Sequence, residues 1–173
     1  MDVSLRAATL PLLDEYYRGF EMDPDIFADM SRFRAYVYAP EKVEAHYDRL
    51  KAAADRVDFL VMLGEKPIGE AALKHIDREK GTCELSIHLQ NDSVKGRGYG
   101  TRAERLAVEY AFGTLGMEAV LASVVRKNAR SQHVLEKLGF ERTGQDEIFV
   151  YYRLNREIRK SQTHSEECDG NDS

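Results

Sequence analysis

Short apolar stretches separated by turn residues predict that much of this chain forms β-strands. Residues 3–7 alternate between apolar and polar side chains, as a half-buried strand does. Three further apolar stretches, at 59–63, 68–76 and 83–89, follow one another with only short glycine-containing turns between them. Because short turns join strands that lie side by side, these three stretches predict an antiparallel meander.

Other segments show the three- and four-residue apolar spacing of amphipathic helices. They cover residues 10–20, a segment opened by Pro40, the stretch from Ala103 to Leu115, and residues 128–139. Asn128 is a suitable N-cap for the last of these helices. We therefore expect helices before the meander and two more after it.

The segment after residue 22 also has the form of a helix start. Asp23 is a good N-cap, and Pro24 suits the first helical position. A helix beginning there would turn Ile26, Phe27 and Met30 toward the core. The surrounding front third of the chain is both acidic and aromatic, which suits either solvated helix faces over a core or a substrate pocket.

The C-terminal half supplies the remaining strands. Residues 119–125 are strongly apolar, as expected for a central strand, and residues 140–143 and 149–154 predict a final strand pair. Residues 155–173 carry no core-forming pattern, so we expect a folded domain at 1–154 followed by a polar, disordered tail.

Residues 95–101, Lys-Gly-Arg-Gly-Tyr-Gly-Thr, lie between a predicted strand and a predicted helix. The first N–H groups of a helix lack internal partners, and glycine lets an anion approach them closely. The segment therefore predicts a phosphate site, although a solvated glycine-rich turn is the simpler alternative. A Walker A loop would need a lysine between Gly100 and Thr101, and the dinucleotide fingerprint would need glycine in place of Thr101.

Composition narrows the classes of protein further. The chain has 173 residues, of which 43% are hydrophobic and 32% charged, and no apolar run is long enough to span a membrane. The net charge of -5 argues against general nucleic-acid binding and is compatible with a cationic substrate. The two cysteines, Cys83 and Cys168, form neither a disulfide framework nor a metal cluster. Together with the lack of a signal peptide, this predicts a cytoplasmic protein without a metal.

Two motifs resemble the GNAT superfamily of N-acetyltransferases. Lys95-x-x-Gly98-x-Gly100 is similar to its Gln/Arg-x-x-Gly-x-Gly/Ala signature, with lysine in the first position. Residues 128–140, Asn-Ala-Arg-Ser-Gln-His-Val-Leu-Glu-Lys-Leu-Gly-Phe, resemble its Asn-x-x-Ala/Ser motif and the Glu-Lys-Leu-Gly-Phe that follows. With Ser131 and Leu135, this motif looks like the branch that contains ribosomal-protein-alanine N-acetyltransferases and their small-molecule relatives.

The resemblance implies a GNAT fold of the α/β (α+β) class. We expect a mixed, mostly antiparallel twisted sheet of about six or seven strands with helices on both faces. The resemblance also implies acetyl-CoA as co-substrate and a primary amine as acceptor, which is a protein N-terminus, a polyamine or another small amine. The residues it assigns to acetyl-CoA are Ile87, His88, Leu89, Lys95, Gly96, Arg97, Gly98, Tyr99, Gly100, Thr101, Asn128, Arg130 and Lys137.

The family also points to catalytic residues. It often places a general base on the strand that precedes the glycine loop, where Glu84 is the only carboxylate and His88 the next candidate. Alternation along this strand leaves open whether Glu84 faces a cleft or solvent. The usual tyrosine acid of the last motif is Leu135 here, so Ser131 is the candidate for protonating the leaving thiolate. Its alternative is a structural hydrogen bond in the first helical turn.

The missing tyrosine also keeps a rival function open. The chain could be a non-catalytic acyl-CoA-binding module that keeps the GNAT fold and the cofactor loop without the chemistry. Glu84 and Ser131 favour an enzyme in which the amine attacks the acetyl group directly. A homodimer is compatible with the sequence, and neither a nucleic acid nor a membrane is expected as a partner.

Overall fold

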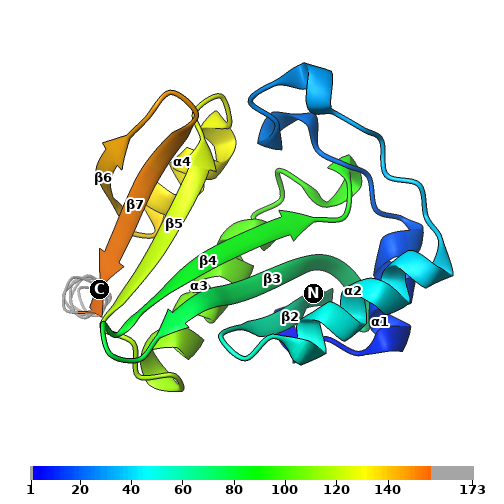
Figure 1. Ribbon diagram of the computed structural model, residues 1–173, viewed down its shortest axis with the longest axis horizontal. Coiled ribbons are helices and arrows are strands. Elements are labelled where there is room, and N and C mark those ends of the chain that lie inside the picture. The colour runs from blue at the N-terminus through cyan, green and yellow to red at the C-terminus, as the bar shows by residue number, and fades with distance from the viewer. Residues whose placement is uncertain (1, 157–173) are drawn as a thin grey trace, which may run out of the picture.

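The computed structural model describes residues 2–156, which form a single seven-stranded sheet with helices on both faces (Figure 1). The expected mixed α/β fold is thereby confirmed. The strands are β1 (Val3–Ala7), β2 (Val57–Leu63), β3 (Lys66–Asp77), β4 (Thr82–Leu89), β5 (Ala119–Val125), β6 (Glu141–Gln145) and β7 (Phe149–Asn155). The α-helices are α1 (Leu10–Arg18), α2 (Pro40–Ala52), α3 (Tyr99–Gly113) and α4 (Ala129–Lys137). The predicted tail lies outside the described residues, apart from its first two positions.

The helices divide between the two faces because successive side chains of a strand point to opposite sides. On β2, Leu60 and Met62 pack with Tyr16 of α1 and with α2. The residue between them, Val61, packs on the other side with Ala103 of α3. The part of β2 from Phe59 to Leu63, which is apolar at every position, therefore packs on both faces, as its unbroken apolar run predicts.

One junction in the sheet differs from all the others. The strand order is β1-β2-β3-β4-β5-β7-β6, and only β4 and β5 run parallel. Their pairing is short, from Thr82 opposite Ala119 to Glu84 opposite Leu121. Beyond that point the two strands diverge, and Figure 1 shows the resulting V-shaped opening. Among residues 2–156, the edge of β4 that faces β5 therefore has no strand partner from Leu85 onward.

The prediction of a helix after Asp23 was wrong. The segment instead contains two short 3₁₀ turns, Pro24–Ile26 and Met30–Arg32. Their aspartate caps, Asp23 and Asp29, each accept a hydrogen bond from the backbone two residues later, and this local bonding ends each turn quickly. Ile26 and Met30 are 46% and 51% exposed instead of facing the core.

The helices of the described part of the chain are all too short or too polar to cross a membrane.

Candidate functional site

The glycine loop has the backbone that a phosphate site requires. It leads into α3, whose N-cap is Gly98 with a φ of 83°. Gly96 has a φ of 71°, and a Cβ added at Gly96 or Gly98 would meet no atom within 4 Å. The left-handed conformation explains why glycine occupies these positions, and the open space leaves the N–H groups of the helix start accessible.

A strongly basic cavity of about 490 Å³ adjoins this loop. Arg97, Arg102 and Arg105 line it together with Lys137 of α4, next to Gly98 and Thr101. The structure thus brings Lys137 and Arg97, two predicted cofactor contacts from distant parts of the sequence, to the same place. Such a cluster suits a ligand that carries several phosphates.

Lys95 is placed differently from its neighbours in the loop. Its Nζ lies 2.9 Å from Asp23 and 3.3 Å from Asp92, and its side chain is only 14% exposed. Burial lowers the pKa of Lys95, but the hydrogen bond and charge of Asp23 outweigh burial and raise it. Lys95 therefore fastens the segment at Asp23 to the loop while lining the neighbouring cavity.

Two further cavities occupy the opening between β4 and β5. One, of about 340 Å³, is lined by Glu84, Asn128 and Ser131. The other, of about 400 Å³, extends to the glycine loop. Its lining includes the predicted cofactor residues Ile87, His88, Leu89, Lys95, Gly100, Asn128 and Arg130, together with Ser131. The two motifs, which are separate in the sequence, therefore face one another across the opening.

Asn128 and Ser131 are held by the start of α4. The Asn128 side chain caps the helix by accepting a hydrogen bond from the Ser131 backbone N–H, at 3.2 Å. The Ser131 hydroxyl forms no hydrogen bond to the described residues and lines both cavities. The hydroxyl is therefore available to a ligand, while the backbone of the same residue has the structural role.

The packing of α3 decides which way Glu84 points. Leu85 is buried against Ala107 and Val108 of α3, so Glu84 and His88 lie on the opposite face, toward α1. Glu84 accepts a hydrogen bond of 3.2 Å from Ser123 Oγ of β5, at the vertex of the opening. The cleft-facing alternative for Glu84 is therefore the one that the structure shows.

Two basic side chains from β3 lie beside Glu84. Lys74 Nζ is 3.9 Å from its carboxylate, and His75 Nε2 is 3.8 Å away. His75 has a φ of 52°, and the β3–β4 register shifts between Lys74 and Asp77. This irregularity turns the imidazole toward the carboxylate, an arrangement that the strand pattern alone did not reveal.

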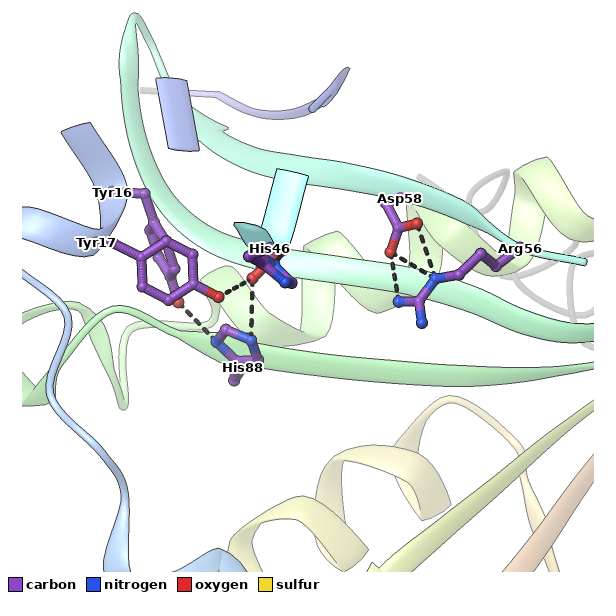
Figure 2. Close-up of polar contacts among 7 residues, drawn as sticks. Tyr16, Tyr17, His46, Arg56, Asp58 and His88 are labelled. Carbon is purple, nitrogen blue, oxygen red and sulfur yellow. Dashed lines mark hydrogen bonds and ion pairs between the residues drawn. The ribbon is translucent and has the colours of Figure 1, made fainter. Parts of the chain in front are cut away.

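The sequence patterns did not predict a hydrogen-bonded cluster next to His88. Glu70 of β3, only 6% exposed, accepts bonds from Tyr17 at 2.5 Å and His46 at 2.6 Å, and His88 Nε2 lies 3.3 Å away. The second nitrogen of His88, Nδ1, shares a 2.7 Å hydrogen bond with the Tyr16 hydroxyl (Figure 2). Burial favours the neutral acid, but the bonds from His46 and His88 outweigh it and lower the pKa of Glu70. A lone glutamate inside an apolar strand was the available signal.

Three rings form one wall of the larger cavity in the opening. Tyr17, Phe20 and Tyr36 have ring centroids 5.2 to 5.3 Å apart and line this cavity together. Phe20 also lies 5.3 Å from the His88 ring. We call Tyr17, Phe20 and Tyr36 the aromatic wall. Rings of this kind attract cations through their faces, so the wall suits a positively charged ligand.

Glu104 was also not predicted as a site residue, although its place in the sequence could have indicated one. It follows Ala103 on the buried stripe of α3 and is only 4% exposed, where an apolar residue is expected. The residue lines both cavities of the opening. Cys83 is buried too, and burial raises the pKa of its thiol to about 11, so it is a poor nucleophile. The described residues contain no cluster that could hold a metal ion.

Comparisons of this chain with known proteins agree with this geometry. Residues 3–141 match the family model described as "Acetyltransferase (GNAT) domain". The "Uncharacterized N-acetyltransferase p20" of Bacillus licheniformis is 25% identical over 70% of this chain and 70% of its own length. The spermidine N(1)-acetyltransferase of Escherichia coli K12 is 28% identical over 58% of this chain, but the match spans only 55% of that protein.

A solved structure supports the fold. RimJ of Mycobacterium smegmatis, in complex with CoA-disulfide, has a TM-score of 0.75 over 94% of this chain and 88% of its own. At 15% identity this likeness shows the fold alone. The family model, however, covers most of the chain, including the glycine loop and the α4 motif. The chain therefore belongs to the GNAT acetyltransferase family.

Proposed function

We propose that this protein is an N-acetyltransferase that transfers the acetyl group of acetyl-CoA to a primary amine. The observation that carries the proposal is the opening between β4 and β5. Its cavities connect the phosphate-binding backbone at Gly100 with Glu84 and Ser131. A binding module needs the first of these features, whereas only an enzyme needs a carboxylate and a free hydroxyl at the far end.

The residues present fit acetyl-CoA. A Cβ would enter the open cradle at Gly96 and Gly98, and the basic cavity beside it offers four cationic side chains for phosphates. The unpaired edge of β4 at 87–89 offers backbone groups to the pantetheine arm. Acetyl-CoA supplies an activated thioester, and the chain supplies the surfaces that hold it.

In this proposal one catalytic side chain acts on the attacking amine and the other on the departing sulfur. Glu84 accepts the proton that the amine must lose, because alkylamines with a pKa of about 10.4 are mostly protonated at neutral pH. Ser131 donates a hydrogen bond to the departing sulfur, and any proton that passes from its hydroxyl to the thiolate is replaced from water. The buried Cys83 is not used, so the amine attacks directly.

The aromatic wall and the carboxylates beside it receive the acceptor. Asp23 and Asp25 line the same cavity as Tyr17 and Tyr36, which favours a cationic amine over a neutral one. A protein N-terminus, a polyamine and another small amine all satisfy this requirement. From Ser131 and Leu135 we infer kinship with the ribosomal-protein-alanine branch.

The test is acetyl-CoA turnover over a panel of amines that includes N-terminal peptides, polyamines and small monoamines. Thiol release measures the rate, and mass spectrometry identifies the acetylated product. We expect at least one amine to be acetylated well above the rate of hydrolysis. Tight acetyl-CoA binding without transfer to any amine would instead favour the non-catalytic module, which the absence of tyrosine at Leu135 suggests.

Replacing Ser131 by alanine should slow acetyl transfer by roughly tenfold. The effect is modest because a thiol of pKa about 8.5 leaves readily even without full protonation. Tyr151→Phe and Tyr152→Phe should transfer at the normal rate, since Tyr151 bonds Asp146 and Tyr152 bonds Glu136, away from both cavities. Single-turnover rates at saturating acetyl-CoA are the measurement, because slow product release could hide the effect. If a tyrosine variant is slow while Ser131→Ala transfers at the normal rate, the proton donor lies on β7 and is not Ser131.

A further inference from the structure

Glu104 is a buried carboxyl group that neither the fold nor the proposed chemistry uses. It lies in the second turn of α3 and is 4% exposed. Its Oε2 is completely buried and has no hydrogen-bond partner among residues 2–156. Leaving a buried polar atom without a partner is destabilising, so such an atom calls for an explanation.

The surroundings keep this group protonated. Burial alone raises the pKa of Glu104 to about 8, so at neutral pH the side chain is mostly an uncharged acid that can donate a hydrogen bond. Its helical neighbours one turn away are Gly100, Thr101, Ala107 and Val108, none of which is charged.

Charged and titratable groups line the same cavities but do not pair with Glu104. From β3 and β4 these are Lys74, Glu84 and His88. From the segment at 23–25, the glycine loop and α4 they are Asp23, Asp25, Lys95 and Arg130. Lys74 lies against Glu84, His88 against Glu70 and Lys95 against Asp23. The proton on Glu104 therefore depends on burial rather than on a neighbouring charge.

The position of Glu104 along α3 indicates what it meets. It lies six positions after Gly98, which corresponds to about 9 Å along a helix. Ile87, Asn128 and Ser131 line both cavities, and so does Glu104, which places it where the two cavities adjoin. A pantetheine arm that starts at the glycine loop and ends near Ser131 has to pass this point, and such an arm carries two amide carbonyls before its sulfur.

We propose that the protonated carboxyl of Glu104 donates a hydrogen bond to an amide carbonyl of the pantetheine arm, so that cofactor affinity falls when this proton is lost. The inference rests on the proposed use of acetyl-CoA. Its sign follows from linkage: the protonated form binds more tightly, so affinity is highest below the pKa of the free protein and declines as pH rises through it. The expected decline between pH 7 and 9.5 is about tenfold or more.

Calorimetric titration with S-ethyl-CoA between pH 7 and 9.5 tests this, because a thioether sulfur neither titrates nor transfers an acetyl group. The wild-type protein is compared with Glu104→Gln, which keeps a donor that does not titrate, and with Glu104→Leu, which has no donor. We expect the Gln variant to bind within a few-fold of wild type at pH 7 and to lack the decline above pH 8. The Leu variant should bind about tenfold more weakly at pH 7, as expected from the loss of one hydrogen bond.

Thermal unfolding and circular dichroism establish that both variants fold. A Leu variant that binds normally at pH 7 overturns the proposal, and so do wild-type and Gln profiles that coincide above pH 8. Normal binding with slow acetyl transfer in both variants overturns it too, in favour of proton transfer by Glu104. In each of these cases the protein still binds the cofactor analogue, so the proposed function survives. No binding by the wild-type protein would overturn both.

Discussion

Replacing Gly100 by valine is expected to abolish CoA binding while the protein stays folded. Gly100 lies in the first turn of α3 and lines the cavity that leads from the loop to Ser131. A Cβ there would meet only Leu89 Cδ1, at 3.8 Å, so the branched side chain projects into the cavity without disturbing the core. Two lost hydrogen bonds to a charged phosphate, at about 1.5 kcal/mol each, correspond to a loss of affinity of roughly 100-fold or more.

Gly100 gives a cleaner test than Gly98. With its φ of 83°, Gly98 would be strained by any side chain, so a loss of binding there could come from a distorted helix start. The matched control is Gly113→Val at the other end of α3, where a Cβ meets nothing within 4 Å. Calorimetry with CoA should show normal affinity for Gly113→Val and, for Gly100→Val, binding that is roughly 100-fold weaker or no longer detectable. Unchanged affinity in a folded Gly100→Val protein would show that the loop does not bind the cofactor.

The sequence predicted the loop and its helix well because their determinants are local. Glycines needed for a left-handed backbone, a helical apolar stripe and an N-cap such as Asn128 act over a few neighbouring residues. The sheet was predictable for the same reason, since short turns fix the pairing of the meander. Pattern and structure disagree at 23–32, where short-range aspartate caps compete with helix formation.

Features that combine residues from distant segments could not be predicted from the sequence patterns. The Glu70 cluster draws Tyr16 and Tyr17 from α1, His46 from α2 and His88 from β4, and no local pattern links them. The direction of Glu84 could not be read from alternation, because that choice depends on Leu85 packing against α3. Periodicity separates two faces of a strand, but only tertiary packing says which face meets the cleft.

The carboxylate of Glu84 should be the largest single contribution to the chemical step. We expect Glu84→Gln to lower turnover by about 100-fold or more, the usual scale for losing a general base, with nearly unchanged CoA affinity. The amide keeps the size of the side chain and can still bond Ser123 Oγ, so the change removes proton acceptance and little else. Because an unprotonated base is needed, the acidic limb of the pH–rate profile should also disappear.

Three further variants make this result specific to Glu84. Glu141→Gln alters an exposed carboxylate on β6 and should leave turnover unchanged. Ser123→Ala removes the hydrogen bond to Glu84 but keeps the carboxylate, so its effect should be several-fold at most. His88→Gln tests the rival base, whose side chain is 41% exposed and lies 3.3 Å from Glu70. If Glu84→Gln turns over at the wild-type rate while His88→Gln is slow, proton removal passes through His88 and the Glu70 cluster instead of the vertex of the β4–β5 opening.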